Sequence, residues 1–418
     1  MANLRHCLIV NPKLRPRAAT AALALAIVFV FAAVTPNTAH AQSFQVLYNF
    51  TGGSDGAQPY AGLTMDRAGN LYGTTHSGNQ GTNWGNVYEL RQHGTGWIFN
   101  ALELFDGALE SGVVFGPNGT LYGTSPNNIS TLVYGYVYNL APPINSFCHS
   151  VMCHWNSTVL YGFTGGADGW APRYGSLVFD SAGNMYDTTS LGGNGNGVVF
   201  EMSHSGPAWT EQPIYTFSGA DGANPFSGVI FDSAGNLYGT TTQGGANGFG
   251  AVYELTRVGL SWTEKVLYSF QGGNDGSLPT AGVILDQAGD LYGSTNAGGA
   301  GGGGTVFELT PSGGNWNYSL IHSFTGGSDC GPWGNLNFDA AGNLVGTTLC
   351  DGAFNAGNVF RLTNSGGTWT YTSVYDFTGG DDGKYPYCNV IFDTAGDMFG
   401  TAFRGGTVGQ GTVWEITP

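Results

Sequence analysis

Acidic residues recur at regular intervals along this chain, and carboxylates at fixed spacing are candidates for metal binding or acid–base catalysis. Six belong to a loop motif of the type G-x-D-G, and a seventh is displaced: Asp55, Asp168, Asp221, Asp275, Asp329, Asp382 and Asp106. Bound Ca²⁺ needs six or more converging oxygens, and one Asp per repeat does not predict convergence. Asp-Gly is also common turn chemistry. We therefore predict no metal and no cofactor, with Ca²⁺ as the alternative.

Bulky side chains follow most of these loops, often after Pro, as in QPY, NPF, GPW and YPY. Exposed rings beside a few hydrogen-bonding groups are typical of a ligand-binding surface. Three basic residues fall in the same loops, and one carboxylate replaces the Gly of an LYGTT-type motif. The predicted ligand-binding residues are Tyr60, Trp84, Trp170, Arg173, Asp187, Phe226, Trp333, Lys384, Tyr385, Tyr387 and Arg404. The alternative is that the aromatic side chains fill gaps between repeats.

A pair of Glu residues could act as the acid pair of a glycosidase. Five Glu residues occupy the same position of the repeat: Glu89, Glu201, Glu254, Glu308 and Glu415. Asn139 and Arg361 take that position in two other repeats, which favours cross-strand pairing over catalysis. The sequence has no Ser-His-Asp, HExxH or phosphate-loop pattern. We predict no catalytic residues and favour a protein that is not an enzyme.

These side chains must be positioned by a scaffold, and the chain repeats one. FDSAGNLYGTT (Phe231–Thr241) has close copies in which one glycine recurs about every 54 residues: Gly69, Gly119, Gly183, Gly235, Gly289, Gly342 and Gly396. Each repeat holds four segments rich in Val, Ile, Tyr, Phe and Thr and bounded by Gly, Asn, Asp or Pro, which is the pattern of strands. We predict an all-β fold, a seven-bladed β-propeller with four antiparallel strands per blade.

The strand count predicts how the ring closes. The last repeat lacks its fourth strand, and FQVLYNF (44–50) has no partner repeat before it. We expect strand 44–50 to pair with strand 411–416, so that few sheet edges stay exposed. D-x-A-G-N is expected to be the turn between the first two strands of a blade, with Gly at positive φ and Asp capping turn amides.

Residues 1–41 have the features of a signal peptide: basic residues, an apolar run from Ala18 to Val34, and Ala39-His40-Ala41 as a cleavage site. An uncleaved membrane anchor is the alternative. The rest, 42–418, is expected to be a single propeller domain with an irregular, disulfide-type insert at 141–154. We expect no transmembrane domain after cleavage, and a secreted, periplasmic or cell-surface location in a bacterium.

Charge and cysteine content narrow the partners. Of 12 Lys and Arg residues, four precede residue 42, so 28 acidic residues face eight basic ones in the remainder. That balance excludes nucleic acid and anionic lipid as expected partners, because both require clustered cations. Export makes disulfides plausible, and the candidates are Cys148, Cys153, Cys330, Cys350 and Cys388. A zinc site at the first two cysteines is the alternative.

The combination of GNLYGTT, G-x-V-F/Y-E-L and V-L-Y-x-F-x-G-G-x-D-G resembles the Gloeo/Verruco (GloVer) tandem-repeat family of exported bacterial proteins, over Phe44–Pro418. The turn alone is similar to the NHL and SBBP propeller repeats. The GloVer resemblance implies export and a repeat fold, without a reaction. We therefore expect an exported, non-catalytic protein that binds an extracellular carbohydrate or a surface protein through its loops. A secreted polysaccharide hydrolase or lyase is the alternative.

Overall fold

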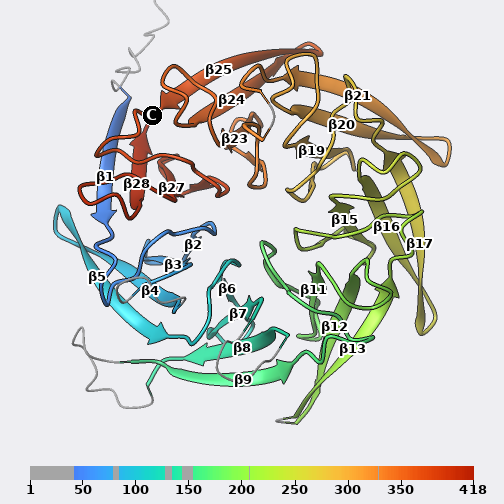
Figure 1. The fold of residues 1–418 in the computed structure, drawn as a ribbon, viewed down its shortest axis with the longest axis horizontal. Coiled ribbons are helices and arrows are strands. Elements are labelled where there is room, and N and C mark those ends of the chain that lie inside the picture. The colour runs from blue at the N-terminus through green and yellow to red at the C-terminus, as the bar shows by residue number, and fades with distance from the viewer. Residues whose placement is uncertain (1–41, 79–83, 128–133, 144–153, 207, 328) are drawn as a thin grey trace, which may run out of the picture. The chain divides into compact units, whose positions relative to one another are not determined.

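The computed structural model describes residues 42–418, apart from 79–83, 128–133, 144–153, 207 and 328. The predicted signal peptide, Cys148, Cys153 and most of the predicted insert lie outside the described residues. The described residues form seven antiparallel sheets of four strands each, arranged in a ring (Figure 1). The predicted seven-bladed β-propeller is confirmed.

The strands take equivalent places in each blade. The innermost strands are β2 (Thr64–Met65), β6 (Val114–Phe115), β10 (Val178–Phe179), β14 (Ile230–Phe231), β18 (Ile284–Leu285), β22 (Asn337–Phe338) and β26 (Ile391–Phe392). The second strands are β3 (Leu71–Thr75), β7 (Leu121–Ser125), β11 (Met185–Thr189), β15 (Leu237–Thr241), β19 (Leu291–Thr295), β23 (Leu344–Thr348) and β27 (Met398–Ala402). The third strands are β4 (Asn86–His93), β8 (Tyr136–Ala141), β12 (Val198–Ser205), β16 (Ala251–Val258), β20 (Thr305–Ser312), β24 (Asn358–Ser365) and β28 (Thr412–Thr417). The outermost strands are β5 (Gly96–Leu104), β9 (Asn156–Gly162), β13 (Ala208–Thr216), β17 (Ser261–Ser269), β21 (Asn315–Ser323), β25 (Thr368–Asp376) and β1 (Ser43–Asn49).

The ring closes through the two ends of the described chain. β1 pairs antiparallel with β28, from Ser43 opposite Thr417 to Asn49 opposite Thr412. Blade 7 therefore consists of β26, β27, β28 and β1, while blades 1 to 6 run in chain order from β2–β5 to β22–β25. The prediction that the strand at 44–50 pairs with 411–416 is confirmed, with the observed bounds shifted by one residue.

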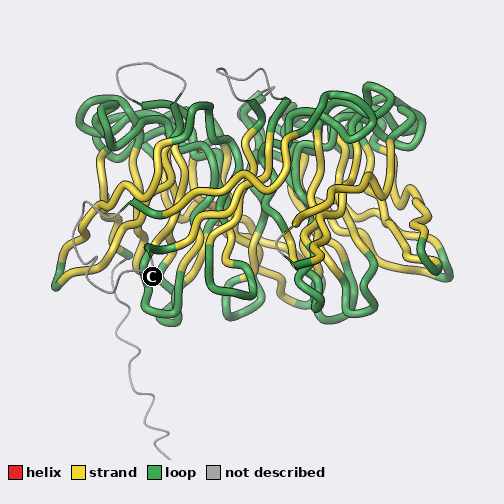
Figure 2. The backbone as a smooth tube through the Cα atoms, turned by 90° about the horizontal axis from the view of Figure 1, so that it is seen from below, coloured by secondary structure: helices red, strands yellow, loops and turns green. Residues whose placement is uncertain are grey.

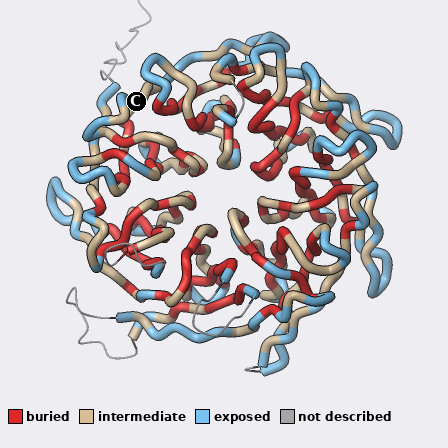
Figure 3. The backbone as a smooth tube through the Cα atoms, in the orientation of Figure 1, coloured by how far each residue is buried: buried red, intermediate tan, exposed pale blue. Residues whose placement is uncertain are grey.

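The outermost strand of each blade carries a β-bulge that turns an extra apolar side chain inward. In blade 1, Val87 faces Glu103 while the next residue, Tyr88, faces Ala101. The skipped residue, Leu102, is only 2% exposed. A bulge breaks the alternation of a strand locally, which explains the apolar run of VLYSF-type segments. Elsewhere the outermost strands mostly alternate exposed and partly buried residues, whereas the second strands are buried throughout (Figure 3).

The core consists of seven clusters, and each cluster joins two neighbouring blades. The cluster between blades 7 and 1, for example, includes Phe399 and Val413 together with Leu71 and Tyr88. Six of the junctions also place the Trp of one outermost strand against the second-strand Tyr or Phe of the preceding blade, with ring centroids 6.1–6.3 Å apart. The fixed Trp position in the sequence thus reflects packing between blades.

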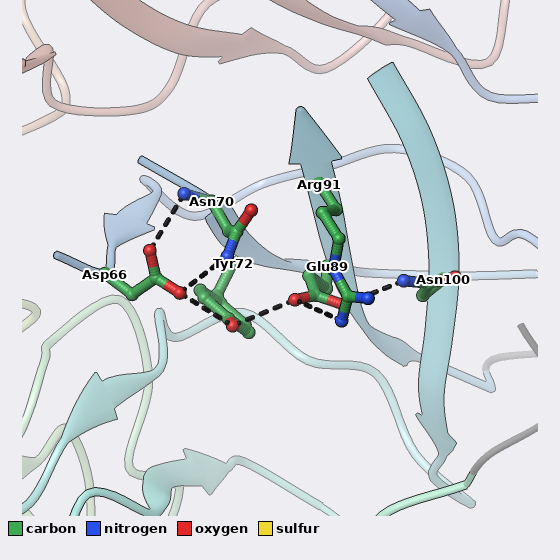
Figure 4. A network of polar contacts seen from close by, with 6 residues as sticks. All are labelled: Asp66, Asn70, Tyr72, Glu89, Arg91 and Asn100. Atoms are coloured by element: carbon green, nitrogen blue, oxygen red, sulfur yellow. Dashed lines mark hydrogen bonds and ion pairs between the residues drawn. The ribbon is translucent and has the colours of Figure 1, made fainter. Parts of the chain in front are cut away.

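The recurring D-x-A-G-N segment is a turn, as predicted. In blade 1, Asp66 Oδ1 accepts hydrogen bonds from the Ala68 and Asn70 amides at 2.8 and 2.9 Å, and Gly69 has φ +84°. Tyr72 Oη donates to Asp66 and to Glu89, whose second oxygen accepts from Asn100 (Figure 4). The D-x-A-G-N segment therefore has a structural role, since its polar groups form hydrogen bonds within the blade.

The glycine of LYGTT-type strands makes room for a third-strand aromatic residue. Gly73 lies opposite Tyr88, and a Cβ at Gly73 would collide with Tyr88 Oη. Equivalent contacts recur at Gly123, Gly239, Gly293, Gly346 and Gly400. The exception, Asp187 in blade 3, lies opposite Phe200 and is described below.

Candidate ligand site on the loop face

The two faces of the ring differ in the loops that they carry (Figure 2). One face, called here the loop face, bears the connecting loops from an outermost strand to the next innermost strand, and the inner hairpin loops between second and third strands. Isolated β-bridges join these two sets of loops in several blades: Ala57 with Ser77, Trp170 with Leu191, Ala223 with Gln243, Ser277 with Ala297, and Lys384 with Arg404. The opposite face, the turn face, bears the D-x-A-G-N turns and the hairpins between third and outermost strands, because all four strands of a blade are antiparallel to their neighbours.

The repeated Asp of the connecting loops fixes a turn. Asp55 accepts hydrogen bonds from the amides of Thr51 and Gly53 and from the hydroxyls of Thr51 and Tyr48. Asp168 has the same set of partners in its own loop. Burial alone would raise the pKa of Asp168, but the hydrogen bonds from Thr164 and Tyr161 lower it below its ordinary value. The described residues contain no cluster of three or more His, Cys, Asp or Glu side chains suited to a metal ion.

One position of the connecting loops, three residues before the buried Leu or Val that precedes each innermost strand, differs from blade to blade. The seven residues at this position are Tyr60, Glu110, Tyr174, Phe226, Thr280, Trp333 and Tyr387. We call them the axial ring, because ring contacts join members from distant blades. Tyr60 stacks on Tyr387 at 4.4 Å and contacts Tyr174 at 5.0 Å, while Trp333 contacts both Tyr387 and Tyr174.

A cavity of about 270 Å³ lies against the axial ring. All members of the ring except Phe226 line it, together with backbone and small side chains from the starts of the blades. Ser176 and Asn335, each two residues after an axial-ring residue, line the cavity and are exposed. The volume is close to the lower limit of small-ligand pockets, about 300 Å³, so it fits one sugar-sized group.

The only carboxylate among the described residues that line this cavity is Glu110. Its Oε1 lies 3.5 Å from His76 Nε2, and its Oε2 lies 3.5 Å from Arg173 Nε. Neither contact meets hydrogen-bond geometry within the described structure, and Glu110 Oε2, Arg173 Nε and His76 Nδ1 are buried atoms without a hydrogen-bond partner there. Thr280 Oγ1 and Trp333 Nε1 are in the same condition. Buried polar groups are normally paired, so this spot holds unused donors and acceptors.

The predicted aromatic residues do not all play the exposed role expected of them. Tyr60, Phe226, Trp333, Tyr385 and Tyr387 are half-buried. Trp84 and Trp170 are 39% and 40% exposed. The other exposed aromatic side chains of the described residues, Tyr134, Phe249 and Phe354, lie like Trp84 in inner hairpin loops, whereas Trp170 lies in a connecting loop. Every exposed aromatic side chain described is therefore on the loop face.

The three predicted basic residues have different partners. Arg173 is engaged beside Glu110 at the axial ring. Lys384 and Arg404 instead face each other across a β-bridge in blade 7, where each backbone amide donates to the other residue's carbonyl, at 2.7 and 3.1 Å. Arg404 lies 5.5 Å from the Phe403 ring, and Phe403 contacts Tyr60 and Tyr387 of the axial ring.

Asp187 is fully buried and does not line the cavity. Its side chain lies so close to Gly175 and Gly228 that a Cβ at either would meet Oδ1. Oδ1 accepts from the Thr188 amide at 2.8 Å, and Oδ2 has no partner among the described residues. Burial raises the pKa of Asp187 to about 7, although the Thr188 amide opposes the shift.

Three of the five third-strand Glu residues accept a hydrogen bond from a second-strand Tyr, which agrees with the cross-strand pairing favoured from the sequence. Tyr238 and Tyr292 donate to Glu254 and Glu308, as Tyr72 does to Glu89. In blade 6 the Tyr is replaced by Val345, and Arg361 takes the Glu position and bridges directly to Asp339 at 3.2 Å. The substitutions compensate each other, which identifies the position as structural.

Two of the predicted disulfide cysteines are paired in the structure and one is free. Cys330 and Cys350 form a disulfide, with Cα atoms 4.6 Å apart. Cys388 as a disulfide candidate is wrong, because its thiol is free and 2% exposed within the core. It donates to the Thr401 carbonyl and accepts from the Thr401 amide. The zinc alternative and any pairing of Cys148 and Cys153 fall outside the described residues.

Sequence reasoning missed Glu110, Tyr174, Thr280 and His76. The first three share the axial-ring position, so aligning the connecting loops on the apolar residue that follows would have found them. His76 carries no such mark, because its role depends on the inner hairpin loop of blade 1 reaching Glu110.

Within the described part of the chain, no helix has the length and apolar character needed to cross a membrane.

Three solved structures are similar to this chain at low levels. A putative oxidoreductase (glucose dehydrogenase) from Thermus thermophilus matches with 13% identity and a TM-score of 0.43, over 90% of this chain and 99% of its own. A protein of unknown function from Dyadobacter fermentans matches with 12% identity and a TM-score of 0.41, over 73% and 93%. PorZ, a surface component of the type-IX secretion system of Porphyromonas gingivalis, matches with 13% identity and a TM-score of 0.40, over 79% and 47%. Such scores assign no function.

No curated protein matches the sequence. The model of the Gloeobacter/Verrucomicrobia repeat matches residues 153–331 and 261–418, which together make up more than half of the chain. The repeat that builds the blades is the one that this family is defined by, and the chain therefore belongs to the Gloeobacter/Verrucomicrobia repeat family.

Proposed function

We propose that this protein is exported, is not an enzyme, and binds an extracellular carbohydrate on its loop face, with the axial ring and its cavity as the central site. The observation that carries the proposal is the axial ring itself. One backbone position, repeated seven times, carries five aromatic side chains, Glu110 and Thr280, and six of these seven residues line a sugar-sized cavity. A position with a purely structural role would be expected to carry the same residue in each blade, as the turn Asp nearly does.

The chemistry of this site suits a sugar. Ring faces can pack against the apolar face of a pyranose, and the unpaired polar atoms of Glu110, Thr280 and Trp333 can bond to its hydroxyls. The exposed aromatic side chains of the surrounding loops, such as Trp170, extend the apolar surface outward. Export is supported by the Cys330–Cys350 disulfide, because such bonds persist mainly outside the cytosol.

Hydrolysis of a polysaccharide has less support. A glycosidase needs two carboxyl groups about 5–10 Å apart on either side of the bond. Glu110 is the only carboxylate among the described lining residues, and Asp187, the carboxylate singled out in the sequence, is packed away from the cavity. A surface protein as ligand is the alternative outcome of the binding test.

The test is a glycan array probed with residues 42–418, with and without EDTA. We expect binding to a limited set of glycans, unchanged by EDTA, and reduced roughly tenfold or more by Trp333→Ala, since a buried aromatic contact is worth about 2 kcal/mol at a binding site. Leu260→Ala, in an exposed hairpin of the turn face, is the matched control and should bind like the parent. Absence of any glycan signal from the folded protein would overturn the proposal.

A further inference from the structure

Blade 7 differs from the other blades at the bridge that joins its connecting loop to its inner hairpin loop. The same bridge in blades 1, 4 and 5 carries small or neutral residues: Ala57 with Ser77, Ala223 with Gln243, and Ser277 with Ala297. In blade 7 it carries Lys384 and Arg404. Since the backbone bridge is retained while the side chains change, the two cations are not needed to hold the loops together.

The placement of these two cations is unfavourable without a counter-charge. Residues that exchange both backbone hydrogen bonds lie about 5.5 Å apart at Cα, and their side chains extend from the same side. Like charges directly opposite each other destabilise a sheet. The described part of the chain places no carboxylate oxygen within 4 Å of Lys384 Nζ or of the Arg404 guanidinium. Three other basic residues of the described chain lie beside carboxylates: Arg91 beside Glu89, Arg173 beside Glu110 and Arg361 beside Asp339.

Each cation lies beside an aromatic ring. Lys384 Nζ is 5.2 Å from the centre of the Tyr385 ring, and Arg404 Cζ is 5.5 Å from that of Phe403. Phe403 in turn contacts Tyr60 and Tyr387 of the axial ring, at 5.5 and 5.2 Å. The cation pair is therefore continuous with the candidate sugar site.

We infer that Lys384 and Arg404 bind an anionic group, a carboxylate or a sulfate, on a sugar next to the one held at the axial ring. The inference rests on the proposed function and narrows its ligand to an acidic polysaccharide. Arg404 can hold a carboxylate or sulfate through two parallel hydrogen bonds, and Lys384 adds a second charge. A polysaccharide chain with widely spaced negative charges can place one charge at the two cations and keep the others away from the acidic protein surface. An anionic membrane surface requires a broader basic patch.

The test compares the affinities of residues 42–418 for polygalacturonate, heparin and neutral dextran by calorimetry at low and high salt. We expect both acidic polymers to bind more tightly than dextran, and Lys384→Ala/Arg404→Ala to weaken their binding roughly tenfold at low salt, the scale of two partly exposed ion pairs. The difference should shrink at high salt. The control, Arg67→Ala/Arg257→Ala, removes the same charge from exposed positions away from the loop face and should change binding less than twofold.

The outcomes separate the two proposals. If the parent binds glycans and the blade 7 variant binds acidic polymers equally well, the inference is wrong and the proposed function stands. If no glycan binds, both are wrong. Binding to phosphatidylserine vesicles that is tighter than to either polymer and lost in the variant would assign the pair to a lipid surface instead. Circular dichroism and thermal melting of both variants establish that they fold.

Discussion

At the residue scale, some repeat positions carry the same structural residue in most blades, whereas others vary in residue type from blade to blade. The turn Asp and the LYGTT glycine recur because each satisfies a local backbone demand, as Asp66 and Gly73 show. At the axial-ring position and at the loop bridge, by contrast, equivalent backbone positions carry side chains that differ between blades. Asp187 belongs to neither group: it replaces a building glycine, yet its carboxyl lies buried between the backbones of blades 3 and 4.

Asp187 makes the stability of the fold depend on pH. Its pKa is about 7 in the folded protein, above the ordinary value of 3.8, because of burial. The folded state therefore holds a proton that the unfolded state releases between about pH 4 and 7, so stability falls as pH rises through that window. The loss amounts to about 4 kcal/mol at pH 8, at 1.36 kcal/mol per pKa unit.

We expect Asp187→Asn to remove this dependence. The variant should melt at a higher temperature than the parent at pH 8 and close to it at pH 4, as measured by calorimetry across pH 4–8. A parent protein and variant that lose stability in parallel between pH 4 and 7 would refute the assignment to Asp187.

At the element scale, neighbouring outermost strands recognise each other through matched pairs. The position concerned lies two residues after the Trp of the outermost strand; in blade 7, where Gln42 replaces that Trp, it is Phe44. In four junctions this residue stacks on an aromatic ring of the preceding blade, with centroids 4.0–4.6 Å apart: Phe99 on Tyr48, Tyr318 on Tyr268, Tyr371 on His322 and Phe44 on Tyr375. In the other three junctions the residue two positions after the Trp is not aromatic, and in one of them the partner also changes. Ser157 donates to Glu103, and Glu211 and Glu264 lie beside Tyr161 and Tyr215.

The Glu-containing junctions can be converted to the stacked type. Burial and the nearby Asp168 raise the pKa of Glu211 to about 8, so its contribution to stability declines as pH rises from about 4.5 to 8. Glu211→Tyr should stack on Tyr161 and raise stability by about 1 kcal/mol, the typical worth of an aromatic pair. Thermal melts at pH 8 should rank Glu211→Tyr above Glu211→Ala, and the reverse order would contradict the pairing rule.

The sequence was enough to predict strands and turns, because each repeat states the same local demands seven times. It was less informative about the site. Tyr60, Trp333 and Tyr387 were predicted as ligand residues, but their approach across the ring depends on the curvature that seven blades impose. Glu110 and His76 were missed because they come from different loops and are joined only in space. Arg173 and Lys384 were grouped because both are basic, but Arg173 lies beside the carboxylate of Glu110 and Lys384 has no carboxylate partner in the described chain.

At the scale of the whole molecule, the ring depends on one junction that the chain does not make locally. Between blades 6 and 7 the Trp–Tyr contact of the other junctions is absent, since Gln42 and Val345 occupy those positions. Phe44 of β1 instead stacks on Tyr375 at 4.0 Å and meets Phe377 edge-on. β1 is therefore held by its ladder with β28, by Phe44 on the blade 6 side and by Tyr48, which stacks on Phe99, on the blade 1 side.

We expect Phe44→Ala to loosen the closing blade specifically. Removing a half-buried Phe should cost about 2 kcal/mol, and hydrogen exchange should accelerate in β1 and β28 ahead of the other blades. Tyr318→Ala, the equivalent change in blade 5, is the control, because Tyr318 stacks on Tyr268 of blade 4 and its strand is covalently continuous with its blade. Equal acceleration in all blades of Phe44→Ala would contradict the role of this junction.

The central claim is that ligand is held by the loop face, over the axial ring, on a scaffold whose turn face takes no part. Hydrogen exchange of residues 42–418 with and without saturating polygalacturonate tests it most directly. We predict slower exchange in peptides covering 55–62, 170–176, 331–335, 384–389 and 402–406, and no change in the hairpins at 93–96, 258–261 and 312–315. Protection confined to those hairpins, or spread evenly over all seven blades, would contradict it.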